Sequence, residues 1–244
     1  MEYVVEALSL SKRYGDVVAV DRLELAVAEG EIYGLIGPNG AGKTTLVKML
    51  VGILRPDRGE ARVLGKPTTD KDVKANIGYM PQERAIYQDL TVEENIAFFG
   101  RIMGVPRSRL DEQVSRAIEL VGLEEKRKTV AMELSGGMQH RLSLACSVVH
   151  DPSLLFLDEP TVGVDPELRA SFWLYFSRLA QEGKTILITT HYMAEASECM
   201  RVGMMRRGGL IAEGEPGELA RRVGATDLED AFLRYSEDLE EGSR

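Results

Sequence analysis

The sequence predicts an α/β fold with a mainly parallel sheet, an N-terminal antiparallel β-subdomain and an inserted all-helical lobe. Residues 3–28 alternate apolar and polar side chains in short runs, which is typical of half-buried antiparallel strands. Residues 91–150 instead show the apolar spacing of helices, and short apolar runs alternate with helical segments again from residue 151. Strands that alternate with helices in this way indicate a layered α/β core.

The first third of the chain is expected to hold several strands and the first core helix. Short strands are expected over residues 4–8, 17–20 and 23–27, because each run alternates and turn residues separate them. A fully apolar strand over residues 32–36 precedes a glycine-rich loop, and a helix is expected over residues 44–54. The residues on the expected apolar face of this helix are Leu46, Val47, Leu50 and Ile53.

Three helices are expected in the inserted lobe. Residues 91–94 read Thr-Val-Glu-Glu, a capping box in which hydroxyl and carboxylate satisfy free backbone N–H groups, and this helix continues to Gly104. The second helix stops at Gly122, and the third runs from Ser135 to about His150. After the lobe, a buried parallel strand is expected over residues 154–157, followed by a helix that Asp165 caps. A strand over residues 185–189 and a short helix over residues 193–200 come next. A hairpin of residues 202–205 with 210–212 and two amphipathic helical segments end the chain.

Composition and charge narrow the functional classes. The net charge of −9 and the pI of about 5.1 argue against a broad nucleic-acid surface, because such surfaces are usually basic. Acidic residues are dense from Asp227 onward and are expected to form a solvated face. No apolar run reaches the roughly 18 residues of a membrane-spanning helix, and the first residues do not resemble a secretory signal. Cys146 and Cys199 indicate neither a disulfide framework nor a metal site, so a reducing cytosol is expected.

Residues 37–44 match the phosphate-loop pattern of a glycine, four residues and Gly-Lys-Ser/Thr without a mismatch. The motif lies between an apolar strand and a helix, as the pattern requires, which argues against a glycine turn that binds nothing. Its backbone N–H groups and the helix dipole favour binding of an anion. Lys43 is expected to reach the β- and γ-phosphates, and Thr44 is expected to bind Mg²⁺. This motif predicts a P-loop NTPase core whose nucleotide-binding loop is Gly37, Pro38, Asn39, Gly40, Ala41, Gly42, Lys43, Thr44 and Thr45.

A second motif consists of the apolar residues 154–157 followed by Asp158 and Glu159. A parallel strand that ends in a carboxylate places that charge at the carboxyl edge of the sheet, where ligands bind in open α/β folds. Asp158 is expected to hold Mg²⁺, directly or through water, and Glu159 to polarise the attacking water. Such a strand end is common by itself, so the phosphate loop earlier in the chain carries the functional interpretation.

A third motif is the turn at residues 135–137, Ser-Gly-Gly, which leads into a helix. Ser135 suits the N-cap position, and a plain helix cap would explain a lone Ser-Gly-Gly. Two adjacent glycines are costly at a helix start, however, unless another group approaches the backbone closely. The position of the turn in the helical lobe, shortly before Asp158, also favours a functional role.

With these three elements in this order, the chain resembles the nucleotide-binding subunit of the ATP-binding cassette (ABC) transporter family. The resemblance extends from residue 3 to about residue 219. It implies one ABC ATPase domain over residues 1–220, with a nucleotide-binding core of 1–90 and 151–220 and a helical lobe of 91–150. Residues 221–244 would then form a C-terminal acidic helical tail.

The resemblance also implies roles for residues that would be ordinary strand-end, loop or capping residues if read alone. Tyr14 is similar to the aromatic residue that stacks on adenine, and Gln82 to the glutamine that senses Mg²⁺ and water. Asp165 is similar to the aspartate that contacts the facing subunit, and His191 to the histidine at the γ-phosphate. His140 departs from the family, which often has Arg, Lys or Gln there. The implied catalytic residues are Glu159, His191, Lys43 and Gln82, and the implied magnesium residues are Thr44, Gln82 and Asp158.

In that family the turn of Ser135, Gly136 and Gly137 closes on ATP held by a second cassette, so two ATP molecules lie at one interface. Residues 156–166, 190–196 and 228–232 look like those of exporter-type cassettes, a subgroup for drugs, sodium, polysaccharides or lipids. The implied cofactors are ATP and Mg²⁺. The implied partners are a second cassette, identical or different, and a separate transmembrane permease, and no nucleic acid is expected. The implied location of the chain is the cytoplasm, on the inner face of the cell membrane.

Residues 84–90 are the candidate groove for a cytoplasmic helix of the permease, although core packing of Ile86, Tyr87 and Leu90 explains the pattern equally well. Two other classes of function are considered. A soluble cassette ATPase that acts on translation factors or in DNA repair usually has paired cassettes, coiled-coil insertions or basic extensions. A phosphate-loop kinase for a small molecule would leave residues 135–137 and His191 without a function.

Overall fold

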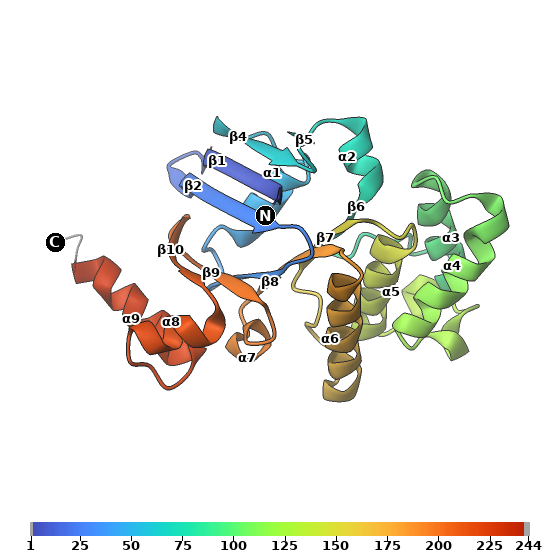
Figure 1. The fold of residues 1–244 in the computed structure, drawn as a ribbon. Helices are drawn as coiled ribbons and strands as arrows, with labels where there is room; N and C mark the ends of the chain where they lie inside the picture. Colours follow the sequence, from blue (N-terminus) through green and yellow to red (C-terminus); the bar gives the residue numbers. More distant parts are fainter. Residues whose placement is uncertain (1, 242–244) are drawn as a thin grey trace.

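The computed structural model describes residues 2–241, without the side chains of residues 238–241, and arranges them as two stacked sheets flanked by helices (Figure 1). The first sheet contains β1 (Tyr3–Tyr14), β2 (Val17–Ala28), β4 (Arg58–Val63) and β5 (Lys66–Pro67). The second sheet contains β3 (Ile32–Ile36), β6 (Ile77–Met80), β7 (Leu154–Asp158), β8 (Thr185–Thr190), β9 (Arg201–Arg206) and β10 (Gly209–Gly214). The α-helices are α1 (Lys43–Leu50), α2 (Lys71–Asn76), α3 (Val92–Ile102), α4 (Arg107–Leu120), α5 (Gly136–Val148), α6 (Pro166–Gln181), α7 (Met193–Ala196), α8 (Pro216–Arg222) and α9 (Leu228–Glu241), and the 3₁₀ helices are η1 (Glu124–Lys126) and η2 (Ala131–Glu133).

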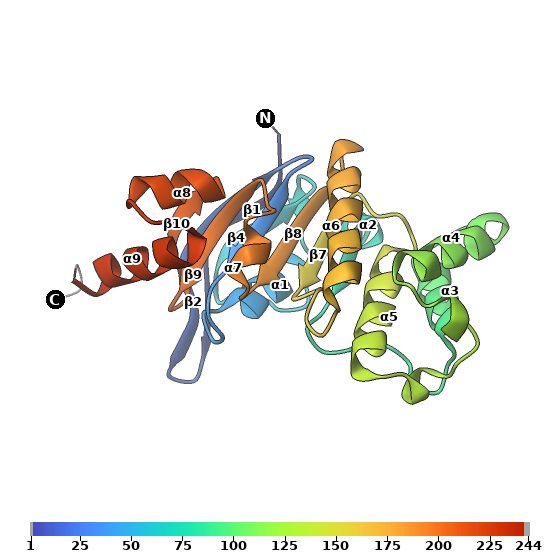
Figure 2. The same ribbon diagram turned by 90° about the horizontal axis from the view of Figure 1, so that it is seen from below.

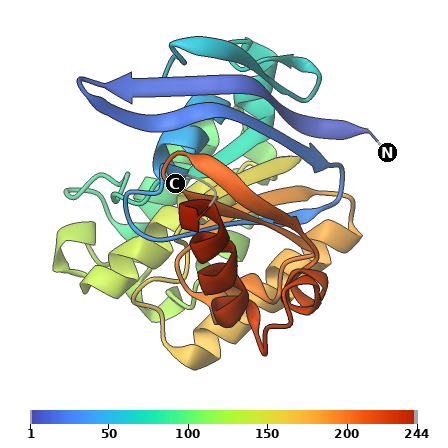
Figure 3. The ribbon, with the colours of Figure 1, turned by 90° about the vertical axis from the view of Figure 1, so that its left-hand side faces the viewer.

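The two sheets differ in strand direction. The first has the order β2-β1-β4-β5 and is antiparallel, and Figure 3 shows it as a layer above the second sheet. The second has the order β10-β9-β3-β8-β7-β6, in which β10 runs antiparallel to β9 and the other neighbours are parallel. This arrangement confirms the predicted α/β class, with its mainly parallel sheet and its antiparallel N-terminal sheet.

The prediction of separate strands at 17–20 and 23–27 is wrong, because both lie in the continuous strand β2. The pairing of β1 with β2 shifts in register between Leu10↔Leu23 and Lys12↔Val20, and Arg22 there has a φ of 42°. An extra residue at a β-bulge interrupts the alternation of a strand that continues through it. The sequence pattern therefore looks like two short strands.

The prediction that the first helix reaches Leu54 is also wrong, because α1 ends at Leu50. Gly52 follows with a φ of 72°, and the N–H groups of Ile53 and Leu54 both bond to the carbonyl of Lys48. A left-handed glycine with such bonds satisfies the last carbonyls of a helix and ends it. As a result, Ile53 leaves the apolar face on which it was expected and is 63% exposed.

Two apolar clusters hold the layers together. The strand β7 contributes to both, because its successive side chains point to opposite faces of the sheet. Leu154 and Phe156 pack with α1 between the two sheets, whereas Leu155 and Leu157 pack on the other face, against α5 and α6. The free, buried cysteines of the chain, Cys146 and Cys199, lie in this second cluster.

The helical segment between β6 and β7 begins as the sequence predicts. Thr91 accepts a hydrogen bond from the N–H of Glu94, and the Glu94 carboxylate accepts one from the N–H of Thr91, so the predicted capping box is present. Figures 1 and 2 show α3 and α4 at one end of the molecule and the C-terminal helices α8 and α9 at the other. The buried Asn95 on α3 fixes the preceding loop, because its side chain bonds to the N–H and the carbonyl of Tyr87.

The last third of the chain follows the predicted order of elements with shifted ends. Asp165 caps α6, Pro166 begins it, and β9 and β10 form the expected hairpin. The short helix expected over residues 193–200 is only α7. In the acidic tail, Glu229 and Glu237 are exposed, whereas the acidic side chains at 238, 240 and 241 lie outside the described residues. Among the helices described here, none is both long and apolar enough to cross a bilayer.

Candidate functional site

The predicted phosphate loop connects β3 to α1 at the carboxyl edge of the parallel sheet. Its glycines are needed, since Gly37 and Gly42 have φ values of 152° and 106°. A Cβ at Gly37 would lie 2.1 Å from the carbonyl oxygen of Met205, and one at Gly42 would lie 2.1 Å from that of Ala19. The turn after β9 also supports the loop, because the N–H of Gly208 donates to the carbonyl of Ala41 at 3.0 Å.

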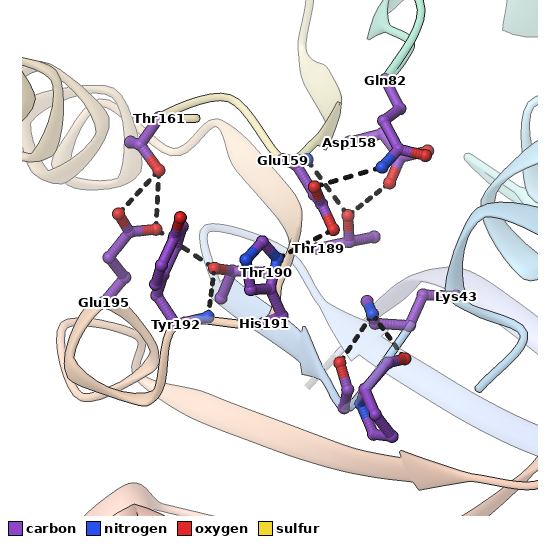
Figure 4. A network of polar contacts seen from close by, with 12 residues as sticks. Lys43, Gln82, Asp158, Glu159, Thr161, Thr189, Thr190, His191, Tyr192 and Glu195 are labelled. Atoms are coloured by element: carbon purple, nitrogen blue, oxygen red, sulfur yellow. Dashed lines mark hydrogen bonds and ion pairs between the residues drawn. The ribbon is translucent and has the colours of Figure 1, made fainter. Parts of the chain in front are cut away.

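Lys43 is the first residue of α1, and its ammonium group lies inside the loop. Its Nζ donates to the carbonyl oxygens of Gly37 at 2.7 Å and Pro38 at 3.1 Å (Figure 4). Burial lowers the pKa of Lys43, although the nearby Glu159 and Asp158 oppose this shift. The loop residues 38–40 are exposed, so a phosphate can approach the concavity that the ammonium group faces.

Asp158 is the last residue of β7 and is fully buried. Its Oδ1 accepts a hydrogen bond from the hydroxyl of Thr189 on the neighbouring strand β8, whereas its Oδ2 has no partner. Burial raises the pKa of Asp158, and the nearby hydroxyls of Thr189 and Thr44 oppose this shift. A buried carboxylate oxygen without a partner, close to the Thr44 hydroxyl, fits a bound divalent cation.

These two residues alone do not complete a metal site. Within the part of the chain that the structure describes, no group of three or more His, Cys, Asp and Glu side chains could hold a metal ion. Mg²⁺ commonly uses one or two protein ligands together with water and substrate phosphates. Thr44 and Asp158 therefore fit Mg²⁺ that arrives with a phosphate ligand.

Glu159 follows directly, and its backbone is strained. It has a φ of 56°, which is uncommon for a residue other than glycine and costs on the order of 1–3 kcal/mol. The backbone around it is held from both sides. Its N–H lies 3.1 Å from both the carbonyl oxygen and the hydroxyl of Thr189, and its carbonyl oxygen lies 2.9 Å from Nε2 of His140.

The carboxylate of Glu159 lies between two of the other predicted catalytic side chains, those of Gln82 and His191. Nε2 of Gln82 donates to Oε2 at 3.2 Å, and Nδ1 of His191 lies 3.1 Å from Oε1 (Figure 4). The ring of Tyr192 packs against the His191 ring, with 4.1 Å between their centroids. Residues from β7, from the end of β8 and from the loop after β6 thus converge on one carboxylate.

A second polar network joins the loops on either side of this carboxylate. The buried Glu195 on α7 accepts hydrogen bonds from the hydroxyls of Thr161, at 2.7 Å, and Thr190, at 3.2 Å. Arg169 on α6 adds a longer ion pair of 3.7 Å. Glu195 therefore links the segment after Glu159 to the segment that carries His191.

We expect the substitution Glu195→Ala to destabilise the chain by about 1–3 kcal/mol, because the buried hydroxyls of Thr161 and Thr190 would lose their acceptor. Urea unfolding followed by circular dichroism measures this loss. Glu198→Ala is the matched control, since Glu198 is exposed on the same segment and should change stability by less than about 0.5 kcal/mol. Equal stability of the two variants would contradict the proposed importance of this network.

The predicted turn of Ser135, Gly136 and Gly137 lies at the start of α5. The Ser135 hydroxyl accepts a hydrogen bond from the N–H of Met138 at 3.3 Å, which confirms the cap. A Cβ at Gly137 would lie 2.7 Å from the carbonyl oxygen of Gly163, so a group does approach this backbone closely. Ser135 and Gly136 themselves are exposed, which leaves their outer side open to another molecule.

Two further predicted residues lie outside the cluster around Glu159. Tyr14 ends β1 and is 51% exposed, with Nζ of Lys12 lying 5.9 Å from the centroid of its ring. Asp165 caps α6 by accepting a hydrogen bond from the N–H of Leu168 at 2.9 Å. An exposed aromatic ring can stack on a base, and an exposed carboxylate can meet a second chain.

Sequence reasoning missed several residues that complete the site. Thr189 faces Asp158 because the two are paired in the register of β8 and β7, so the strand end itself was a usable signal. His140 contacts the backbone of Glu159 from a distant part of the chain, and no local pattern marks it. Arg84, which the sequence places only in the candidate permease groove, lies over Gly136 at the start of α5. The sequence marks His140 only as a departure from the family, yet its side chain is buried against the backbone of Glu159.

The fold and this site define a phosphate-loop nucleotide-binding protein. The model of the family described as "ABC transporter" matches residues 20–162, which is more than half of the chain. The chain therefore belongs to the ABC transporter family, as the sequence predicts.

Relatives and solved structures agree with this assignment. The chain is 43% identical over 244 residues to "Probable multidrug ABC transporter ATP-binding protein YbhF" of Escherichia coli (strain K12), covering 97% of this chain but 42% of that protein. It is 42% identical to "Nod factor export ATP-binding protein I" of Paraburkholderia xenovorans, covering 93% of this chain and 76% of the relative. The chain thus spans less than half the length of YbhF.

Among solved structures, "Structure of ATP binding subunit of ABC transporter" superposes with a TM-score of 0.88 at 25% identity, covering 96% of this chain and 99% of that chain. A second, the dimeric ATP-binding cassette MJ0796 in a post-hydrolysis state with ADP and Pi, has a TM-score of 0.81 at 22% identity, covering 86% of this chain and 98% of that chain. The second comparison supports the shared fold.

Proposed function

We propose that the chain binds and hydrolyses ATP as the cassette subunit of an exporter, and that two cassettes close around two ATP molecules. The observation that carries this proposal is the Glu159 carboxylate, held between Gln82 and His191 at the same sheet edge as Lys43 and Asp158. A helix N-terminus with glycines and a lysine binds the phosphates, and a carboxylate beside them can accept a proton from water.

The binding step uses groups that are already in place. The ammonium of Lys43 exchanges its bonds to the loop carbonyls for bonds to the β- and γ-phosphates. Thr44 and Asp158 would hold Mg²⁺, which neutralises phosphate charge when it is bound. Tyr14, an exposed ring at a strand end, suits stacking on the adenine.

For hydrolysis, we assign the role of general base to Glu159. Its two oxygens are oriented separately, by Gln82 and by His191, and such a positioned base contributes roughly 10²–10⁴ in rate. His191 is half-buried and can turn its ring toward the γ-phosphate, where an N–H stabilises developing charge. The strained backbone of Glu159 is consistent with a catalytic position, because strain is often retained at active sites.

The second cassette supplies the outer side of each site. Ser135 and Gly136 are exposed at the N-terminus of α5, a helix end that favours an anion. The MJ0796 cassette, which has the same fold and is dimeric with ADP and Pi bound, supports pairing of this chain with a second cassette. Asp165, exposed at the start of α6, would contact the facing subunit.

We expect Ser135→Arg to prevent the ATP-dependent dimer while the single chain still folds and binds ATP. Loss of the cap costs only about 1 kcal/mol, whereas a long cationic side chain would occupy the interface. Size-exclusion chromatography with light scattering measures the dimer, and titration calorimetry measures ATP binding. Ser108→Arg, at an exposed serine in the first turn of α4, should still dimerise. If Ser135→Arg instead weakens ATP binding by the single chain alone, the turn serves its own site and the two-chain model fails.

We propose that a separate membrane-spanning permease binds beside the loop 84–90. Tyr87 is half-exposed, and its ring packs at 4.6 Å from Phe98 and 6.1 Å from Phe99, with Ile102 exposed on the same helix. An aromatic cluster that is partly open to solvent suits an apolar helix face. Ile86, by contrast, packs against the core, which explains its apolar side chain without a partner. Binding to a permease would place the chain in the cytoplasm, on the inner face of the cell membrane.

The relatives support an exporter without naming the substrate of this chain. YbhF is named as a multidrug transporter protein and the other relative as a Nod factor export protein. Copurification from membranes rather than ribosomes separates the exporter from a soluble cassette that acts on translation. Phosphate transfer to a small molecule without an ATP-dependent dimer would favour a kinase.

A further inference from the structure

The side chain of Arg84 connects the loop that carries Gln82 to the start of α5. Its Nη1 donates to Oε1 of Gln139 at 2.7 Å. Its Nη2 covers Gly136, where an added Cβ would lie 2.9 Å from that nitrogen. A guanidinium from one loop therefore lies directly on the turn that, by our proposal, contacts the facing subunit's ATP.

Gln139 is placed to transmit the position of this guanidinium to the turn. It is 7% exposed, and its Nε2 donates to the carbonyl oxygens of Ala131 at 2.8 Å and Leu134 at 3.3 Å. Leu134 directly precedes Ser135. A hydrogen bond from a charged donor is stronger than one between neutral groups, so Gln139 should follow Arg84 when Arg84 shifts. Because Gln139 also bonds to the carbonyl oxygen of Leu134, the backbone before the turn would move with it.

The other end of the connection lies in the chain's own site. Gln82 comes two residues before Arg84 in the same loop and donates to Glu159 at 3.2 Å. On α5, the neighbour of Gln139 is His140, whose Nε2 lies 2.9 Å from the Glu159 carbonyl oxygen. The start of α5 is thus connected to Glu159 by two routes. One runs from Gln139 through Arg84 and Gln82 to the Glu159 carboxylate, and the other runs from His140 to the Glu159 carbonyl oxygen.

We propose that Arg84 is a positioning residue that couples the chain's own ATP site to the turn at residues 135–137, so that ATP in one site favours closure of the other. This inference rests on the proposed two-chain site. When ATP and Mg²⁺ change the contacts of Gln82, Arg84 moves with the same loop and re-aims the turn through Gln139. Because coupling between two binding sites is reciprocal, two such links in a dimer produce cooperative use of ATP.

The test compares the ATP dependence of hydrolysis in the full chain and in Arg84→Ala. The unaltered chain should show a Hill coefficient above 1 and at most about 2, the number of sites. In Arg84→Ala the coefficient should fall to about 1. The chain should stay folded, with a Tm lowered by only a few degrees, because the exposed Arg84 loses one hydrogen bond to the buried Gln139. Arg109→Ala, at an exposed arginine on α4, is the matched control and should keep the original coefficient.

Two further measurements separate coupling from simple loss of binding. In a Ser135→Arg background, which isolates the single chain, Arg84→Ala should leave the affinity for ATP unchanged. The effects of Arg84→Ala and Gln139→Leu on the coefficient should not add in the double variant, because both break one connection. An unchanged coefficient in Arg84→Ala, or fully additive effects, would overturn the inference. Absence of any ATP-dependent dimer in the unaltered chain would instead overturn the proposed function.

Discussion

Lys43→Ala is expected to lower the affinity for ATP by on the order of 100-fold or more. The ammonium group is buried inside the loop and is the cation positioned for the β- and γ-phosphates. Loss of charge-assisted bonds to an anion costs about 3 kcal/mol, which corresponds to a factor of roughly 100 in the dissociation constant. Titration calorimetry with ATP and Mg²⁺ measures the change.

The helix that carries Lys43 also provides the control. Lys48 lies in the last turn of α1, away from the helix N-terminus, so Lys48→Ala should bind ATP as the unaltered chain does. Thermal unfolding of both variants checks that α1 keeps its place between the two sheets. If Lys43→Ala binds ATP with the same affinity as the control, the loop at residues 37–44 does not bind the phosphates in the proposed way.

Glu159→Gln is expected to reduce the rate of hydrolysis by roughly 10²–10⁴ and to give a long-lived dimer with ATP bound. The amide keeps the size and polarity of the side chain but cannot accept a proton from water at neutral pH. Gln82 and His191 would still orient it, so binding and closure should survive. Single-turnover kinetics measure the rate, and light scattering with ATP and Mg²⁺ measures the dimer.

Glu198→Gln is the matched control for this experiment, because Glu198 is an exposed carboxylate on the segment after His191. It should hydrolyse ATP at the original rate and dimerise only transiently. Hydrolysis at the original rate by Glu159→Gln would show that another group activates the water. Failure of both variants to dimerise would argue against closure around ATP.

The elements that follow local rules could be predicted from the sequence. The capping box at Thr91, the Asp165 cap and the buried strand before Asp158 each depend on neighbours within a few residues. The phosphate loop is equally local, because a strand, a glycine turn and a helix start follow one another. Each of these features can therefore be recognised without knowledge of the rest of the fold.

The elements that depend on distant contacts could not be predicted. The exposed strand β4 pairs with β1 across the chain, and its own residues lack a clear apolar face. The contact of His140 with Glu159 likewise joins residues whose proximity only the packing of α5 on the sheet creates. Spacing along the chain carries no information about such pairs.

The turn after β9 has a consequence for any shortened form of the chain. The family match ends at residue 162, yet the loop at 37–44 rests against the carbonyl of Met205 and the N–H of Gly208. A fragment that ends at residue 162 would retain every residue of the phosphate-loop motif. It would lack β8 and β9, the strands on either side of β3, and the contacts of Met205 and Gly208 that hold the loop in its conformation. We therefore expect the smallest fragment that binds a nucleotide to extend beyond residue 208, well past the segment that matches the family model.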